Sequence, residues 1–120
     1  MKIGIIGAVK KEIILLRKKI KSCTIKKIGN QKFYNGYLHG INITILKSGI
    51  GKVAASMMTT LLISYYNPDI IINIGSAGSI SSLLKIKDII VPDKTSYYDV
   101  DLSIFNYSIG QIPKYPNFFL

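Results

Sequence analysis

The stretch Asp69–Ser79, with the sequence DIIINIGSAGS, decides the fold of this chain. Ile70–Ile72 is an uncharged β-branched run preceded by Pro68, a pattern typical of a strand buried on both faces of a parallel sheet. The run leads into the small residues Gly75–Ser79, whose backbone a ligand can approach closely. Because open α/β sheets bind ligands at the carboxyl ends of their strands, we predict that Ser76–Gly78 form the surface on which a planar or sugar-like group binds. A plain tight turn after a core strand is the alternative for this stretch alone.

The composition fits one domain, or part of one. The chain has 120 residues, of which 48% are hydrophobic and 18% charged, enough apolar material for a core. No run approaches the roughly 18 apolar residues of a membrane span, and no secretory cleavage pattern follows the short apolar run at the start. Cys23 is the single cysteine, so it cannot form an internal disulfide. We therefore expect a cytoplasmic protein without a membrane partner.

The net charge of +10 makes nucleic acid an obvious partner to consider. Arg17 is the only arginine, however, and lysine lacks the planar fork that reads bases and phosphates in a bidentate manner. The lysines also lie mostly between the predicted strands, and the joint excess of Ile, Lys and Asn is what coding drift toward A and T would produce. We predict no nucleic-acid partner.

Hydrophobic periodicity along the chain predicts alternating strands and helices. We expect a hairpin turn at His39–Gly40, and from Lys94 onward only short turns rich in aromatic residues and proline. This order indicates an α/β fold with a mixed sheet. Because the sequence finishes on bulky apolar residues just after a proline-rich loop, we expect it to be the first half of a domain. The predicted strands are 2–6, 23–28, 32–38, 41–46, 70–72 and 86–91, and the predicted helices are about 9–21 and 53–66.

Several common functional motifs are absent from the sequence. Gly49–Lys52 resembles part of a phosphate-binding P-loop, but Leu46 stands where the first glycine is needed and Val53 where Ser or Thr is needed. The dinucleotide fingerprint lacks its third glycine, and no Ser–His–Asp set is visible. His39 is the only histidine and is expected at a hairpin tip. With a single histidine and a single cysteine, we predict neither a metal site nor a cofactor.

Glu12 is the one residue that carries recognisable chemistry in this sequence. It is the only glutamate and falls in the first turn of the first predicted helix, just beyond the end of the first strand. The positive potential of a helix N-terminus favours a carboxylate there, and a carboxylate at the carboxyl edge of a sheet can act as a general base on water. Simple complementation of the helix dipole is the alternative role.

Four separated blocks of the sequence, in order and at matching spacing, resemble the 5′-methylthioadenosine/S-adenosylhomocysteine nucleosidase family. The resemblance covers the whole chain and implies the nucleoside-phosphorylase-like fold, a three-layer α/β sandwich with a mixed sheet, of which residues 1–120 would be the N-terminal part. It also implies a homodimer. The blocks are Gly4–Ala8 with Glu12, Lys47–Ala55, Pro68–Gly78, and Asp99–Asp101 with Gly110–Pro113.

The resemblance implies hydrolysis of the N-glycosidic bond of an adenine nucleoside that carries a 5′-thioether, releasing adenine in methionine salvage. Glu12 matches the catalytic base, and the family's general acid and ribose-binding carboxylate lie beyond position 120. The remaining matches are to substrate-binding positions. Ser76, Ala77 and Gly78 match the wall beside ribose and base, Val9 and Ile50 match the lining of the 5′-alkylthio site, and Leu102, Phe105 and Pro113 match residues lent by the neighbouring subunit.

Two departures and three alternatives accompany this resemblance. Val9 stands where the family commonly has methionine, and Tyr98 where it often has histidine. A nucleoside phosphorylase is disfavoured because Glu12 would repel phosphate and no arginine falls near Ser48 or Gly7. A futalosine-type nucleosidase and a truncated, non-catalytic remnant stay open. We expect the isolated 120-residue chain to be inactive.

Overall fold

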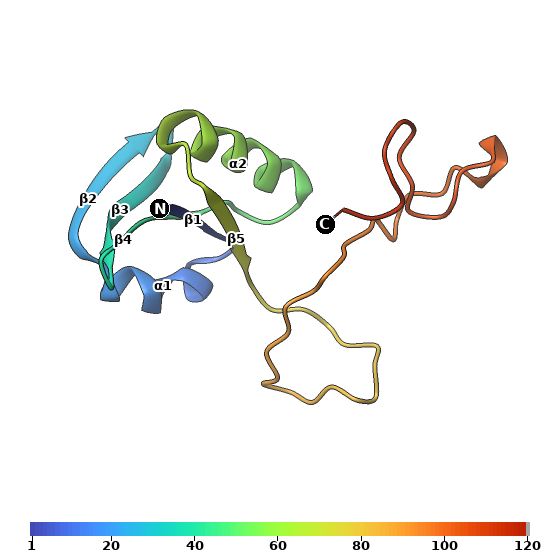
Figure 1. The fold of residues 1–120 in the computed structure, drawn as a ribbon, viewed down its shortest axis with the longest axis horizontal. Coiled ribbons are helices and arrows are strands. Elements are labelled where there is room, and N and C mark those ends of the chain that lie inside the picture. Colours follow the sequence, from blue (N-terminus) through green and yellow to red (C-terminus); the bar gives the residue numbers. More distant parts are fainter. Residues whose placement is uncertain (120) are drawn as a thin grey trace. The chain divides into compact units, whose positions relative to one another are not determined.

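The computed structural model describes residues 1–119, which fall into two compact units. Unit 1 is Met1–Gly78 and unit 2 begins at Ser79. Figure 1 shows the elements of unit 1, whose bounds agree with the predicted ones to within two residues. The strands are β1 (Lys2–Gly7), β2 (Lys21–Ile28), β3 (Gln31–Leu38), β4 (Ile41–Lys47) and β5 (Ile70–Ile74), and the helices are α1 (Lys10–Lys19) and α2 (Lys52–Tyr66).

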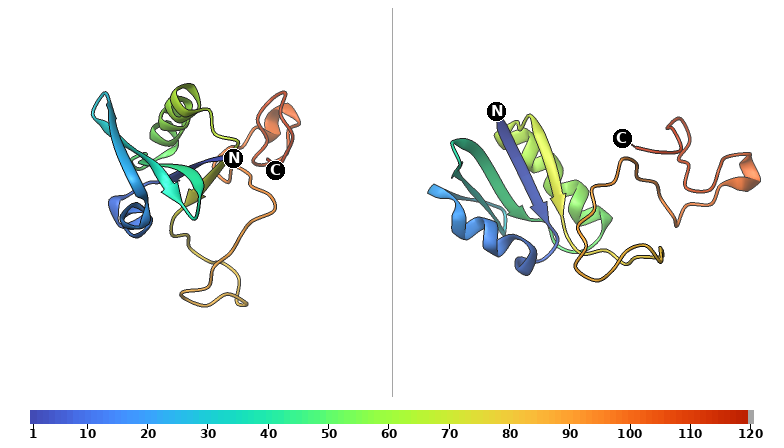
Figure 2. Two further views of the ribbon diagram at one scale, coloured as in Figure 1. Left: turned by 60° about the vertical axis from the view of Figure 1, so that its left-hand side comes forward. Right: turned by 60° about the horizontal axis from the view of Figure 1, so that its bottom comes forward.

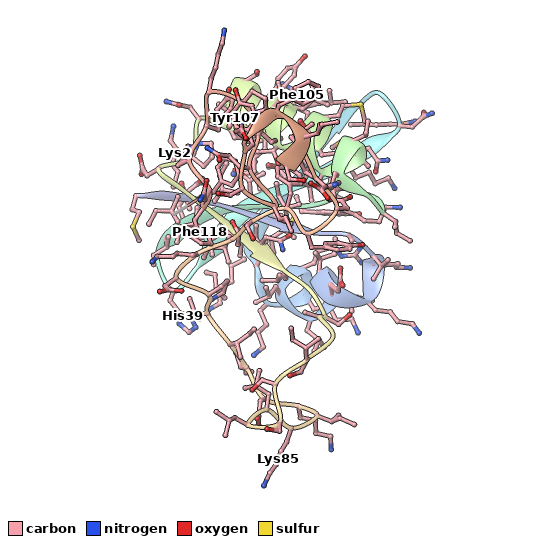
Figure 3. The ribbon with its side chains drawn as sticks, turned by 90° about the vertical axis from the view of Figure 1, so that its right-hand side faces the viewer. Lys2, His39, Lys85, Phe105, Tyr107 and Phe118 are labelled. Atoms are coloured by element: carbon pink, nitrogen blue, oxygen red, sulfur yellow. The ribbon has the colours of Figure 1, made fainter. Side chains whose placement is uncertain are left out.

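The five strands form one mixed sheet in the order β2-β3-β4-β1-β5. β1 pairs in parallel with both β4 and β5, whereas β3 pairs antiparallel with β2 and β4. His39, labelled in Figure 3, has a φ of 49° and lies in the turn between β3 and β4, as predicted. The prediction of an α/β fold with a mixed sheet is therefore confirmed.

Alternation along the strands separates two cores, because successive side chains point to opposite faces of a sheet. Ile5 packs with Ile13 of α1 on one face, while Ile6 packs with Met58 and Leu62 of α2 on the other. Figure 2 shows α1 and α2 on opposite sides of the sheet, which gives the three layers. Each fully buried side chain of this size contributes about 1.5–3 kcal/mol, so both helices are held chiefly by these contacts.

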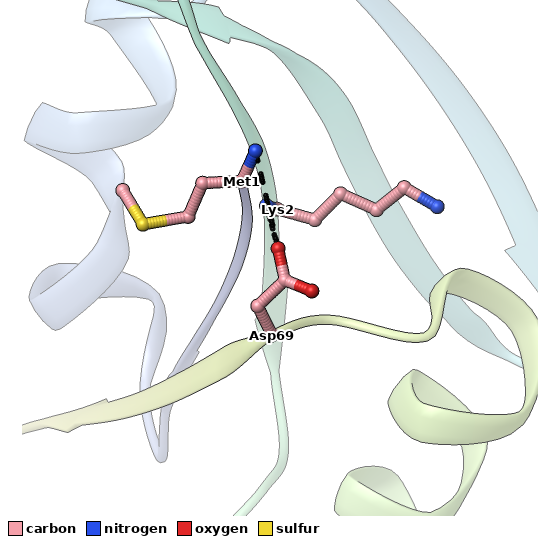
Figure 4. A network of polar contacts seen from close by, with 3 residues as sticks. All are labelled: Met1, Lys2 and Asp69. Carbon is pink, nitrogen blue, oxygen red and sulfur yellow. Dashed lines mark hydrogen bonds and ion pairs between the residues drawn. The ribbon is translucent and has the colours of Figure 1, made fainter.

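The starts of β1 and β5 are joined by polar contacts with Asp69 (Figure 4). The backbone N–H of Lys2 donates to Asp69 Oδ2 at 2.7 Å, and the Asp69 N–H donates to the Lys2 carbonyl at 2.9 Å. The terminal ammonium of Met1 lies 3.9 Å from the same carboxylate oxygen. These contacts fix the register in which Ile3 stands opposite Ile70.

β5 departs from the prediction of a strand buried on both faces. Ile70, Ile71 and Ile72 are 47%, 38% and 41% exposed, although Ile74 packs against the core that contains α1. The reason is position: β5 is the edge strand and pairs only with β1. The apolar run predicted the strand correctly, but its burial requires a neighbour that unit 1 does not provide.

Unit 2 contains short turns, as predicted from Lys94 onward, and a 3-10 helix, η1, at Ser103–Phe105. The predicted strand 86–91 is wrong, because this segment pairs with no strand within residues 1–119 and its side chains are exposed. Thr95 and Phe119 form an isolated antiparallel bridge. Lys85 lies in the long loop that precedes these turns (Figure 3). Within residues 1–119, neither helix is long and apolar enough to cross a bilayer.

Candidate functional site

The carboxyl ends of three parallel strands meet at one edge of the sheet in unit 1. Gly7, the last residue of β1, stands opposite Lys47 of β4 on one side and Ile74 of β5 on the other. Two backbone hydrogen bonds join the loop after β4 to the end of β1 and the loop that follows it. The Ser48 N–H donates to the Gly7 carbonyl at 2.9 Å, and the Gly49 N–H donates to the Ala8 carbonyl at 3.2 Å. This is the edge at which the sequence predicts a ligand.

Glu12 lies at this edge and is held by the first turn of α1. Its Oε2 accepts a hydrogen bond from the Val9 N–H at 2.9 Å, while its own N–H donates to the Val9 carbonyl at 3.1 Å. The pair satisfies one of the N–H groups that a helix start leaves without an intrahelical partner. Glu12 is half-buried, so its carboxylate is both anchored and reachable.

Two glycines flank the Glu12 carboxylate. A Cβ placed on Gly75 would lie 3.2 Å from Oε1, and one placed on Gly7 would lie 3.4 Å from Oε2. The carboxylate therefore lies against the ends of β1 and β5, in space that the side chain of a larger residue at position 7 or 75 would occupy. This role of Gly7 and Gly75 was not predicted from the sequence, although both stand at strand ends, where close approach of another group is a common reason for glycine.

The predicted substrate-binding residues of unit 1 lie in the loops at the same edge. Ser76, Ala77 and Gly78 directly follow Gly75 and are exposed. Apart from its two chain neighbours, no residue within 1–119 has an atom within 4 Å of the Cβ position of Gly78, so its backbone is open to a ligand. Val9 is half-buried, and Ile50, in the loop after β4, is 83% exposed. Glu12 and these five residues thus share one sheet edge.

Leu102, Phe105 and Pro113 belong to unit 2. Leu102 is half-buried and precedes η1, Phe105 closes η1 and is 68% exposed, and Pro113 is exposed. The nearby Asp101 is a poor general acid, since the Ser103 backbone N–H, 3.0 Å from Asp101 Oδ1, and the Ser103 side chain lower the pKa of its carboxyl. A proton donor at neutral pH needs a raised pKa instead.

Residues that could bind a metal do not cluster in the part of the chain that the structure describes. Among residues 1–119, no three His, Cys, Asp or Glu side chains are grouped closely enough to hold an ion. Cys23 is free and exposed on β2, and His39 lies in the turn between β3 and β4.

The sequence and the fold of this chain are similar to those of known proteins. The family model described as Phosphorylase superfamily matches residues 2–119. A curated 5′-methylthioadenosine/S-adenosylhomocysteine nucleosidase of Buchnera aphidicola subsp. Schizaphis graminum is 58% identical over 99% of this chain and 51% of its own length.

Solved nucleosidase structures also match nearly the whole chain, among them the following two. The nucleosidase from Colwellia psychrerythraea in complex with adenine superposes with a TM-score of 0.97 at 42% identity, covering 100% of this chain and 50% of that one. The Neisseria meningitidis nucleosidase in complex with methylthio-immucillin-A gives 0.94 at 36% identity, covering 98% and 51%. The chain spans about half the length of the curated relatives it matches.

Proposed function

This chain belongs to the phosphorylase superfamily, and we propose that it is the N-terminal part of a single nucleosidase domain. The proposed reaction is hydrolysis of the N-glycosidic bond of 5′-methylthioadenosine and S-adenosylhomocysteine, with release of adenine, as a step of methionine salvage in the cytoplasm. The observation that supports it most is the Glu12 carboxylate, anchored by Val9 and set against Gly75 where β1 and β5 end.

Glu12 is assigned the role of general base. Its Oε2 already accepts the Val9 N–H, so we assign the water to Oε1, the oxygen nearest Gly75. As the C–N bond breaks, its electron pair leaves with adenine and the sugar gains oxocarbenium character. The water oxygen bonds to the anomeric carbon, its proton passes to Glu12, and an acid protonates adenine. Water is the only co-reactant, so the scheme requires no cofactor.

The loops at the same edge supply the proposed substrate contacts. The Gly78 backbone approaches the purine, and Ser76 and Ala77 form the wall beside ribose and base. Val9 and Ile50 line the site of the 5′-alkylthio group; Ile50 is 83% exposed, which leaves apolar surface for such a group to cover. In a homodimer, the partner would complete this lining with its copies of Leu102, Phe105 and Pro113.

We assign the general acid to a part of the nucleosidase domain outside residues 1–120, because the lowered pKa of Asp101 suits a permanent carboxylate and no other Asp matches that role in position. The 120-residue chain alone is therefore expected to release no adenine. A truncated, non-catalytic remnant is the second candidate, and the observation that favours it is coverage of about half of each relative.

A chimera tests the proposed activity. Residues 1–119 are joined to the half of the Schizaphis graminum relative that this chain does not match, and adenine release from 5′-methylthioadenosine is followed by chromatography. Glu12→Gln is expected to lower kcat by about 10²–10⁴-fold, the usual contribution of a general base. The amide oxygen can still accept the Val9 N–H, so the first turn of α1 should be retained.

Lys11→Gln is the matched control, because Lys11 is the exposed neighbour of Glu12 on α1. It should leave turnover unchanged. An inactive but folded chimera would favour the remnant. A chimera that keeps full activity with Glu12→Gln would remove Glu12 from the mechanism, as would turnover by the 120-residue chain alone that survives this substitution.

A further inference from the structure

A cavity of about 310 Å³ lies on the side of the sheet that α1 covers, and Glu12 is not among its lining residues. Ligand sites commonly begin at about 300 Å³, so this volume suits a small molecule. Four of its lining residues are cationic and none is acidic. The lining residues are Lys10, Ile13, Arg17, Asn30, Gln31, Lys32, Tyr34 and Lys47.

Three lysines stand in a row across three strands, and two of them, Lys32 and Lys47, line this cavity. Lys27 of β2 is directly paired with Lys32 of β3. The pairing of Phe33 with Leu46 places Lys32 beside Lys47 of β4, one residue further along the same ladder. Like charges directly opposite each other in a sheet destabilise it. The row is thus a local electrostatic conflict that an anion would relieve.

Arg17 of α1 faces this row in a fixed orientation. Its Nη1 donates to the Tyr34 hydroxyl at 3.2 Å, and its guanidinium carbon lies 4.9 Å from the centre of the Tyr34 ring. The arginine is half-buried. A guanidinium held on an aromatic ring loses little further freedom when it binds an oxyanion, and its planar fork matches phosphate geometry.

The chain's own carboxylates do not neutralise this cluster. In the part of the chain that the structure describes, no Asp or Glu lies within 4.0 Å of the charged nitrogens of Lys10, Lys32 or Lys47. Glu12, the acidic residue of α1, is engaged by Val9 and lies against Gly75. The cavity therefore concentrates positive charge beside two amide side chains that can add hydrogen bonds.

We propose that this cavity binds a small phosphate-bearing polyanion of the diphosphate class. Four cations from one helix and two strands line one pocket, which suits adjacent phosphate groups better than a single one. A nucleic-acid strand would instead require a stripe of charge with stacking platforms, and the one aromatic ring lining the cavity is already covered by Arg17. The inference does not depend on the proposed nucleosidase activity.

Calorimetric titration of the 120-residue chain with pyrophosphate tests the proposal. One site per chain is expected, with an affinity that falls as salt rises. Lys32→Gln combined with Lys47→Gln should weaken binding about tenfold or more, since each removes a charge-assisted contact. Lys18→Gln combined with Lys19→Gln removes the same charge from exposed positions of α1 outside the cavity and should change the affinity less than about twofold.

Arg17→Lys provides a second variant with unchanged net charge. It should still weaken pyrophosphate binding several-fold, because the fork and its contact with Tyr34 are lost. Circular dichroism of every variant checks that the sheet is retained. Equal weakening by both lysine pairs, tighter binding of a single-stranded oligonucleotide than of pyrophosphate, or no binding of pyrophosphate by the folded chain would each overturn the proposal.

Discussion

Replacing Gly75 by alanine should lower turnover while leaving the fold intact. The new Cβ would lie 3.2 Å from Glu12 Oε1, 3.6 Å from its Cδ and 3.9 Å from Oε2. The first contact is shorter than the usual carbon contact of about 3.5–4.0 Å, so the carboxylate must move by a few tenths of an ångström. Because Oε2 is held by Val9, the displacement falls mainly on Oε1, the oxygen assigned to the water.

The size of the effect follows from that displacement. A misplacement of about 1 Å can cost about 10²-fold in rate, so a shift of about 0.3–0.5 Å should lower kcat roughly four- to tenfold. Gly75 does not have a positive φ, so alanine brings no backbone strain and restricts the unfolded chain. The free energy of unfolding should therefore stay level or rise by less than about 1 kcal/mol.

The chimera described above provides the assay for Gly75→Ala, with kcat measured by adenine release and stability by urea denaturation. Gly7→Ala is the informative contrast, because its Cβ would meet Ile13 Cγ2 at 2.7 Å and should destabilise the protein by about 1–3 kcal/mol. Lys11→Ala, on the exposed side of α1, serves as a neutral reference. Unchanged kcat in a folded Gly75→Ala chimera would refute the assignment of Oε1 to the water.

Two further predictions concern the core that α2 covers. Leu62→Ala should lower the free energy of unfolding by about 2–5 kcal/mol, since Leu62 is fully buried, whereas the half-exposed Ile63→Ala should cost much less in the same urea titration. Burial raises the pKa of the Tyr66 hydroxyl above its ordinary 10.0. The folded state therefore holds this proton more tightly, and the associated stability is present below about pH 10 and lost as pH rises through the raised pKa. Tyr66→Phe should reduce this alkaline loss, and denaturation from about pH 8 to 11 would show an unchanged slope if the interpretation is wrong.

The positions of the strands and helices could be predicted from the sequence because the local pattern of apolar and polar residues controls them. Ile5 and Ile6 are neighbours in β1 yet pack into different cores, one against α1 and the other against α2. A strand buried on both faces is typically a nearly continuous apolar run, and β1 fits that pattern. The same pattern located β5 from the run Ile70–Ile72.

The exposure of β5 and the absence of a strand at 86–91 within the described structure could not be predicted in the same way. An apolar run reports that a segment suits burial, but burial itself depends on a partner elsewhere in the fold. Ile70–Ile72 has only β1 beside it, and 86–91 pairs with nothing within residues 1–119. Both errors therefore have one cause: the sequence pattern specifies what a segment could pair with, and the pairing is a tertiary fact.

The residue that performs the proposed chemistry and the residue that shapes the space beside it differ in how well the sequence predicts them. Glu12 was predictable, since it is the only glutamate and follows a strand end, whereas Gly75 contributes by lacking a side chain and gives no chemical signal in the sequence. The residues that contact the Glu12 carboxylate, Val9 and the glycines at positions 7 and 75, all lie within unit 1. The carboxylate should therefore adopt the same geometry in the 120-residue chain and in the chimera, while only the chimera turns over substrate. This separation lets structure and activity measurements test the two halves of the proposal independently.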